Sequence, residues 1–295
     1  MANFIDIEMI PVGKYLSDEK AIRVPEYQRS YAWTDDEVTQ LWSDLMDSMQ
    51  NQRPEYFIGP IVVKGTSAGE SELIDGQQRL STVLGIVSAI RRAFRRNGDS
   101  ERADLLSTKY FGEKDFATLK NRDKFFMNEE NGGVFRDFIS REVAEDLLEK
   151  EKLKYQKKNS NFLLLQSALT INDLHTAYSG RDKFTPERPI ALLRYLTENV
   201  KVLILRVQDE ADAYTIFETL NDRGRSLDTL DLLKNHLFSK SKSYLPEVKE
   251  KWSAIRENLF DVDPKNRFLH HFWTSLYGRG ASTTRPLHNR HRKER

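Results

Sequence analysis

The residues best suited to chemistry lie in ELIDGQQRLSTV, the stretch from Glu72 to Val83. An apolar run ends there at Ile74 and a second one begins near Leu80, so we expect a strand, a polar turn and then a helix. Backbone N–H groups at the N-terminus of a helix have no partner within the helix and carry partial positive charge, which attracts anions. The turn therefore predicts a binding site for a phosphate group.

Each residue of this turn fits such a site. Gly76 lets the backbone approach a ligand because it has no Cβ, and Arg79 offers a planar guanidinium that matches phosphate oxygens. Gln77 and Gln78 add neutral donors and acceptors, and Asp75 can hold a divalent cation or orient a water molecule. The alternative is a plain connection between a strand and a helix, because Asp-Gly turns are common.

A second arginine lies among aromatic residues in VPEYQRSYAW, which begins at Val24. If this stretch is a strand, Tyr27, Arg29 and Tyr31 share one face and Gln28 lies on the other. An arginine flanked by rings suits a phosphate whose base is stacked. The alternative is an edge strand whose aromatic side chains only pack.

The third polar motif is FETLNDRGRSLDTLDLLKNHLF, which predicts two helices, Ala211–Leu220 and Leu230–Phe238. The turn between them contains Asn221, Arg223 and Gly224, and one interpretation is that it closes over a ligand held elsewhere. A helix-turn-helix that reads DNA is the alternative. The second helix begins with acidic residues, however, where a DNA-reading helix needs hydrogen-bond donors.

The composition restricts the class of protein. The sequence has 46 basic and 45 acidic side chains, so any site for a polyanion must be local. It has no cysteine, which excludes disulfides, thiolate metal sites and cysteine nucleophiles. The N-terminal residues include acids where a signal peptide carries positive charge, and no apolar run approaches the length of about 18 residues that a membrane span needs. We expect a cytoplasmic protein that does not enter a membrane.

Several local patterns predict how the first hundred residues fold. AIRVPEYQRSYAW and YFIGPIVVKG are typical of strands, and Gly59 with the proline that follows it predicts a bulge or an edge feature. Thr34 and Glu37 have the spacing of a capping box at the start of a helix. Asn97 and the glycine after it predict the end of the helix that follows the turn. The run RRAFRR, Arg91–Arg96, predicts a solvated basic helix end.

Residues 101–295 divide into three parts that differ in composition and hydrophobic pattern. Residues 101–200 form charged helical segments, separated by predicted breaks such as the Asn-Gly-Gly that begins at Asn131. KVLILRV predicts a strand that returns to the first sheet, so that residues 201–280 supply a strand and a helical pair completing the site. Residues 281–295 are a basic, unpatterned tail. The fold class is α+β: a small mixed sheet with helices over residues 1–100, followed by a mostly helical region.

The three motifs, in this order and spacing, resemble the N-terminal domain of GmrSD-type, modification-dependent restriction proteins. The resemblance covers nearly the whole chain, weakly in the middle and strongly at the motifs. It implies a ParB/sulfiredoxin-like fold with a nucleotide-binding core over residues 1–100. It also implies that the Asp-Gly-Gln-Gln-Arg turn binds a nucleoside triphosphate and supports its hydrolysis.

From the turn chemistry and this resemblance together we expect the following site. Its catalytic residues are Asp75, Gln78 and Arg79. Its nucleotide-binding residues are Tyr27, Gln28, Arg29, Gly76, Gln77, Asn221, Arg223 and Gly224. The expected cofactor set is a nucleoside triphosphate with Mg²⁺ or another divalent cation, held by Asp75.

Proteins of this kind defend against phage by restricting modified DNA, and they carry a C-terminal HNH-type nuclease domain or act with a partner that supplies one. The sequence has no room for that domain, so we expect nuclease activity to require a separate nuclease domain or subunit. The expected partners are a nucleoside triphosphate and DNA, including modified phage DNA. Two alternatives stay open: a non-catalytic module that binds modified DNA or another protein, and a scaffold in which every motif is structural.

Overall fold

The structure is a computed structural model, and contacts between its residues divide the chain into two units, Met1–Leu220 and Asn221–Arg295. In the second unit, Glu247 and Lys251 lie one helical turn apart and form an ion pair of 2.6 Å. The candidate site belongs to the first unit. The residues that the structure describes are 6–65, 70–115, 117–119, 121–141, 143–180 and 184–208, together with 244, 247–248, 250–252 and 254.

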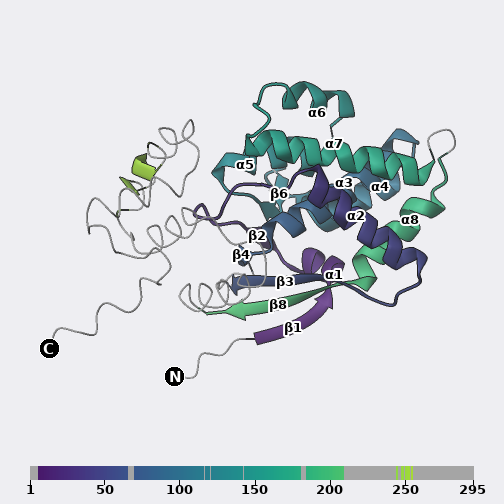
Figure 1. Ribbon diagram of the computed structural model, residues 1–295, viewed down its shortest axis with the longest axis horizontal. Helices are drawn as coiled ribbons and strands as arrows, with labels where there is room; N and C mark the ends of the chain where they lie inside the picture. Colours follow the sequence, from purple (N-terminus) through teal and green to yellow (C-terminus); the bar gives the residue numbers. More distant parts are fainter. Residues whose placement is uncertain are drawn as a thin grey trace, which may run out of the picture. The chain divides into compact units, whose positions relative to one another are not determined.

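In the described part of the first unit, strands and helices are interspersed from β1 to α3, helices predominate after α3, and strand β8 comes last (Figure 1). The strands are β1 (Asp6–Pro11), β2 (Ala21–Arg23), β3 (Tyr56–Gly65), β4 (Glu70–Asp75), β5 (Gly112–Lys114), β6 (Asn121–Asp123), β7 (Phe125–Phe126) and β8 (Val200–Val207). The α-helices are α1 (Val12–Asp18), α2 (Asp35–Gln50), α3 (Gln77–Arg96), α4 (Ser100–Leu106), α5 (Glu129–Val134), α6 (Glu145–Lys152), α7 (Ser160–Ser179) and α8 (Glu187–Arg194). The π-helical turns among the described residues are η1 (Ser107–Phe111), η2 (Phe135–Ser140) and η3 (Tyr195–Asn199).

The main sheet is mixed and has the strand order β1-β8-β3-β4-β2-β7. β8 is antiparallel to β1 and parallel to β3, so the run KVLILRV does return to the first sheet, as predicted. The register of β3 shifts between Phe57 and Gly59, which confirms the predicted bulge. The predicted α+β class is confirmed, and residues 101–200 are mostly helical, with the short hairpin of β5 and β6 among the helices.

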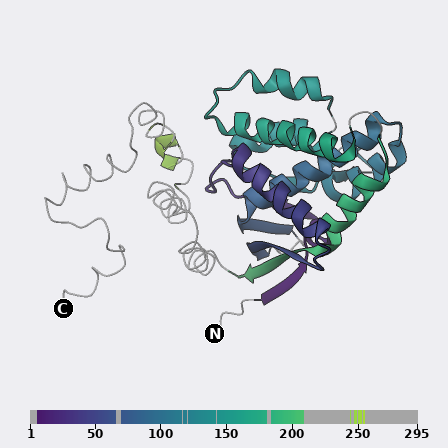
Figure 2. The same ribbon diagram turned by 45° about the vertical axis from the view of Figure 1, so that its right-hand side comes forward.

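The helices lie in layers on one side of this sheet (Figures 1 and 2). α2 and α3 lie next to it, α7 lies across them, and α6 is outermost. Every residue of α3 from Leu80 to Phe94 is buried, because the helix lies between the sheet and α7 and also packs against α4. Within the described residues, no helix combines the length and the apolar character needed to cross a membrane.

The start of α2 and the end of α3 form where the sequence places them. Glu37 accepts the Thr34 backbone N–H at 2.8 Å in a capping box, so the predicted start of α2 is confirmed. Asn97 is the C-cap of α3, and Gly98 follows with φ of +82°, as the Asn-Gly pair predicted. These are local interactions between residues a few positions apart, which a sequence pattern can encode directly.

The solvated basic end predicted for Arg91–Arg96 is wrong for its first two residues. Arg91 and Arg92 are buried. Arg91 donates to the carbonyls of Ser140 at 2.9 Å and Ile139 at 3.0 Å, and its guanidinium lies 4.1 Å from the ring centroid of Phe111. The guanidinium therefore satisfies the carbonyls at the end of η2, which have no partner within their own helix.

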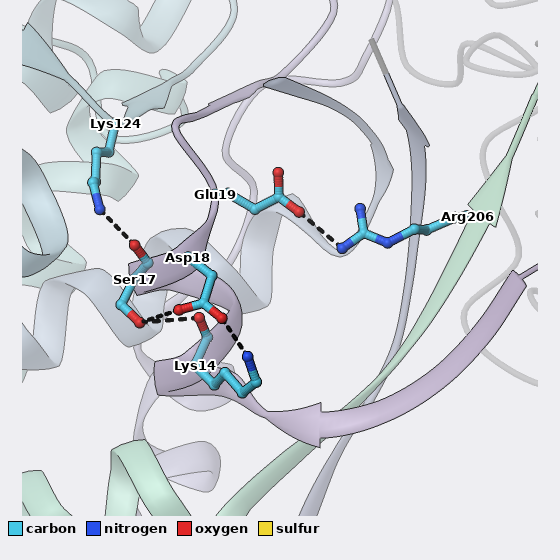
Figure 3. Close-up of polar contacts among 6 residues, drawn as sticks. All are labelled: Lys14, Ser17, Asp18, Glu19, Lys124 and Arg206. Carbon is cyan, nitrogen blue, oxygen red and sulfur yellow. Dashed lines mark hydrogen bonds and ion pairs between the residues drawn. The ribbon is translucent and has the colours of Figure 1, made fainter. Parts of the chain in front are cut away.

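Long-range polar contacts tie the first helix to the rest of the unit, as Figure 3 shows. Arg206 of β8 forms an ion pair of 2.9 Å with Glu19, the residue that follows α1. Lys124, which lies between β6 and β7, donates to the Ser17 carbonyl at 2.7 Å. Ser71 of β4 donates to Glu19 at 2.8 Å. The last strand and the middle of the chain are thus fixed to the N-terminal part.

Candidate functional site

The turn between β4 and α3 has the backbone geometry of an anion site. β4 ends at Asp75, and α3 begins at Gln77 rather than near Leu80, where the sequence predicted its start. The glutamines continue the helix because glutamine is a good helix former. Leu80 donates to the Gly76 carbonyl at 3.0 Å, so the three N–H groups before it have no acceptor within the helix.

Gly76 makes this turn possible. Its φ of +100° and ψ of 5° lie in the left-handed region, which side chains other than glycine rarely adopt. A Cβ at this position would also lie 2.9 Å from Cγ1 of Ile61. Any larger residue would be strained and crowded, so the junction of strand and helix depends on this glycine.

Arg79 lies in the first turn of α3 and pairs with the last residue of β4. Its Nη2 is 3.0 Å from Oδ2 of Asp75, and the two side chains are 20% and 22% exposed. The pair is largely buried yet reachable from solvent. Asp75 holds the guanidinium in one orientation, and a phosphate group can compete for the same nitrogen atoms because its oxygens match their geometry.

Gln77 and Gln78 bind the stretch VPEYQRSYAW to the start of α3. Gln78 accepts the Ala32 N–H at 2.9 Å and donates to the Ser30 carbonyl at 3.2 Å. Gln77 donates through Nε2 to the carbonyl of Arg29. Both side chains are buried and hold backbone groups. The first two motifs of the sequence therefore meet at one place, and the nucleotide-binding and catalytic roles of these glutamines stay predictions.

The other atom of the Gln77 amide is an unused acceptor. Nε2 has to face the Arg29 carbonyl, because two carbonyl oxygens cannot share a hydrogen bond, and this fixes the orientation of the amide. Oε1 is then buried without a hydrogen-bond partner in the described part of the chain. Since buried polar atoms are nearly always bonded, Oε1 can accept a donor from a ligand or from a bound water molecule.

The strand predicted over AIRVPEYQRSYAW is wrong beyond its first three residues. β2 covers only Ala21–Arg23, and the chain then turns, with the Gln28 N–H donating to the Pro25 carbonyl at 3.0 Å. Proline has no N–H and cannot continue the ladder. The residues expected to share one face are consequently separated, because Tyr31 is buried and Arg29 is exposed.

The segment from Glu26 to Ala32, called the Arg29 loop below, presents its side chains in three ways. Tyr27 is half-buried and packs against the apolar cluster that includes Ile74, next to Asp75. Gln28 is buried. Arg29 is exposed and forms no ion pair with another residue of the described chain. Arg29 is therefore the cation that the loop offers to solvent beside the N-terminus of α3.

Tyr31 anchors the Arg29 loop in the core. Its hydroxyl lies 2.9 Å from Oγ1 of Thr82 on α3 and 2.9 Å from Oγ of Ser167 on α7. Burial raises the pKa of Tyr31 to about 12, so the hydroxyl stays protonated and can serve both partners. The loop is consequently fastened to two helices at its C-terminal end.

Sequence reasoning missed the residues that hold the loop from the other side. The Asn-Gly-Gly predicted as a break lies within α5 instead. Asn128 donates to the Gln28 carbonyl at 3.1 Å, and Asn131 accepts the Tyr31 N–H at 2.7 Å. Ser30 donates to the carboxylate of Glu130. Only the unusual polarity of NEENGG within a helical region could have pointed to them.

A divalent cation at this site would depend on one carboxylate of the described chain. The described residues contain no group of three His, Cys, Asp or Glu side chains that could hold a metal ion. Asp75 alone fits the usual pattern for Mg²⁺, which binds through one or two carboxylates together with substrate phosphates and water. The donor set thus suits a cation that arrives with a phosphate ligand.

The remaining predicted site residues cannot be placed. Asn221, Arg223 and Gly224 lie outside the described residues, as do the helices predicted at Ala211–Leu220 and Leu230–Phe238 and the tail at 281–295. The described site therefore consists of the β4–α3 turn and the Arg29 loop.

The sequence matches the family of the GmrSD restriction endonuclease N-terminal domain over residues 12–238. The matched range includes the turn, the Arg29 loop and Asn221 to Gly224. A comparison with curated proteins gives no match.

Proposed function

Because the chain belongs to the family of GmrSD restriction endonuclease N-terminal domains, we propose that it binds and hydrolyses a nucleoside triphosphate as part of a restriction system directed against phage. Membership of the family makes it a restriction-system protein. The proposal that it binds and hydrolyses a nucleotide goes further than family membership, and it rests on the geometry of the β4–α3 turn.

One observation carries the proposal. The free N-terminus of a buried helix of 20 residues, the guanidinium of Arg79 in its first turn and the exposed Arg29 on a loop bonded to that turn are gathered at one place. Partial positive charge and two guanidinium groups suit a polyanion of small size. A triphosphate fits this arrangement better than a single carboxylate ligand does.

Each residue of the site has its own role in the proposed hydrolysis. Arg79 and Arg29 bind phosphate oxygens, and the N–H groups of the first turn of α3 bind a further oxygen. Asp75 orients the attacking water, whose oxygen bonds to the terminal phosphorus as the bond to the bridging oxygen breaks. The products are a nucleoside diphosphate, inorganic phosphate and a proton. Gln78 contributes by holding the backbone of the Arg29 loop in place.

Mg²⁺ or a similar cation, when bound with the triphosphate, neutralises charge on the phosphate oxygens. Asp75 is the residue that would hold it. In the structure Asp75 pairs with Arg79, so the same carboxylate would serve either the guanidinium or the cation. Asn221, Arg223 and Gly224 are proposed to close the site.

The partners proposed are DNA, including modified phage DNA, and a nuclease domain or subunit of HNH type. Family membership supports both, because a restriction endonuclease acts on DNA. We place the protein in the cytoplasm, where nucleoside triphosphates and invading DNA are both present. Nucleotide hydrolysis would then control when the nuclease acts.

A thermal-shift panel of nucleoside triphosphates with and without Mg²⁺, followed by measurement of phosphate release, tests the proposal. A ligand that binds only the native state raises its melting temperature. Arg79→Ala should weaken binding by roughly ten- to a hundredfold, because one charged contact to phosphate contributes on the order of 1.5–3 kcal/mol. Arg96→Ala, at the exposed end of the same helix, is the matched control. Equal binding by Arg79→Ala and the parent would show that the site is elsewhere.

The second candidate is a module that binds modified DNA without catalysis, and the exposed Arg29 beside the half-buried Tyr27 favours it. A salt titration separates the two functions. DNA binding through several phosphate contacts falls steeply with salt concentration. Phosphate release in the absence of DNA supports the enzyme instead.

A further inference from the structure

A layer of polar side chains, buried except for the half-buried Glu130, lies beneath the Arg29 loop. It connects the start of α5 and the start of α7 to the loop, and every side chain in it is bonded to another member or to the loop backbone. Its members from the helical region are Asn128, Glu130, Asn131, Ser160 and Asn161.

Asn131 is at the centre of this layer and is completely buried. Its Oδ1 accepts the Tyr31 N–H at 2.7 Å, and its Nδ2 donates to Oδ1 of Asn161 at 2.7 Å and to Oγ of Ser160 at 3.0 Å. Both N–H donors are used and the oxygen accepts a backbone N–H, so the amide has one orientation. A side chain fixed in this way fixes the backbone of Tyr31 as well.

Glu130 makes the second connection. Its carboxylate accepts hydrogen bonds from the hydroxyl of Ser30 in the loop and from the hydroxyl of Ser160, the latter at 2.8 Å. Ser160 is the first residue of α7, where a negative charge is favoured by the helix dipole. The N-terminus of α7 therefore holds the Glu130 carboxylate independently of the loop. Ser30 of the loop is bonded to this carboxylate.

Four successive residues of the loop, from Gln28 to Tyr31, are thus held through their backbone from two directions. Side chains of α3 bind the carbonyls of Arg29 and Ser30, and side chains of the α5 region bind the Gln28 carbonyl and the Tyr31 N–H. The Arg29 side chain is left exposed. These backbone contacts restrict the conformations of the loop before a ligand binds.

From this arrangement we infer that Asn131 and Glu130 are positioning residues of the nucleotide site. They hold the Arg29 loop in the conformation that places Arg29 beside the N-terminus of α3. The inference rests on the proposed function and extends it: the helical region at residues 128–161, together with the sheet, determines affinity for the triphosphate. A loop ordered in advance does not lose conformational entropy when a ligand binds, so disordering it lowers affinity.

The test compares Asn131→Ala with Asn172→Ala. Asn172 is also a buried asparagine, and it lies on α7 bonded to Arg92, where it has no bond to the loop. Asn131→Ala should bind the triphosphate on the order of tenfold more weakly, with a raised KM and a kcat changed much less. Asn172→Ala should lower the melting temperature but leave both the affinity and KM at the parent values. Hydrogen exchange at the Tyr31 amide should become faster in Asn131→Ala alone.

A double variant shows whether Asn131 acts through Arg29. If it does, Asn131→Ala should have little further effect on affinity in an Arg29→Ala background. Ser30→Ala, which removes one hydroxyl at the edge of the layer, serves if Asn131→Ala does not fold, and it should show a smaller loss in the same direction.

The outcomes separate the two ideas. Faster exchange at Tyr31 with unchanged affinity would overturn the positioning role while leaving the proposed function intact. An equal loss of affinity in Asn172→Ala would also overturn it, because the effect would be general destabilisation. Absence of any nucleotide-dependent shift in the parent protein would overturn both.

Discussion

The guanidinium of Arg79 lies directly against the backbone of Gly59. A Cβ at Gly59 would overlap Nη1 of Arg79, so the arginine occupies the space that a side chain would need. Gly59 has a φ of +117° and sits at the bulge of β3. The bulge of β3 and the β4–α3 turn therefore act together. The glycine at the bulge leaves the space, and α3 places the Arg79 guanidinium in it.

Gly59→Ala should displace Arg79 and weaken nucleotide binding. The new methyl group takes the space of Nη1, and the left-handed backbone adds strain of about 1–3 kcal/mol. Gly65→Ala is the matched control, because Gly65 is in the same strand and has open space around its Cα. Titration of a triphosphate by thermal shift measures both variants. If Gly59→Ala keeps the parent affinity, the position of Arg79 does not matter for binding.

Gln78→Leu should destabilise the protein by about 1–3 kcal/mol, because the Ala32 N–H and the Ser30 carbonyl lose their partner. Gln78→Glu keeps the acceptor for Ala32 but brings a carboxylate oxygen to the Ser30 carbonyl, so it should destabilise too. Chemical denaturation measures both changes. A stable Gln78→Glu variant with greatly reduced kcat would instead identify Gln78 as a group that acts on the reacting atoms.

Arg91→Met should lower the free energy of unfolding more than Arg96→Met does. Arg91 satisfies the carbonyls of Ile139 and Ser140 inside the protein, and each costs about 1–3 kcal/mol when left unpaired. Arg96 pairs with Glu145 at 3.1 Å on the surface, where such pairs contribute roughly 0–1 kcal/mol. Urea denaturation distinguishes them, and equal effects would show that Arg91 does not serve as an internal cap.

Acid should destabilise the protein through His175. Burial, followed by the positive charges of Arg96 and Arg92, lowers the pKa of His175 from 6.5 to about 4. The unfolded chain therefore takes up a proton at a higher pH than the folded one. This contribution to stability is complete above pH 6.5 and is lost as the pH falls to about 4, with a total of about 3 kcal/mol.

His175→Gln removes the titrating group and leaves a neutral side chain near Ser179, with which Nε2 of His175 shares a hydrogen bond of 3.1 Å. Between pH 6.5 and 4 its free energy of unfolding should fall less than that of the parent. Denaturation curves at several pH values measure the difference. Parallel pH profiles for the two proteins would contradict a depressed pKa.

The sequence by itself determined the features that neighbouring residues decide. The capping box of Thr34 and Glu37 joins residues three positions apart, and the bulge at Gly59 follows from a glycine and a proline in an apolar run. The apolar run of β8, with its β-branched residues, predicted a strand that pairs in the main sheet. The family, too, follows from motifs that can be read along the chain.

Only the tertiary structure decided which partners the polar side chains have. Gln78 bonds to Ser30 and Ala32, and Asn131 bonds to Tyr31, 100 positions away in the chain. Arg91 is buried although it begins a basic run, RRAFRR. A polar group removed from water must take whichever partner the packing brings near, and that depends on how distant helices stack, which no local pattern encodes.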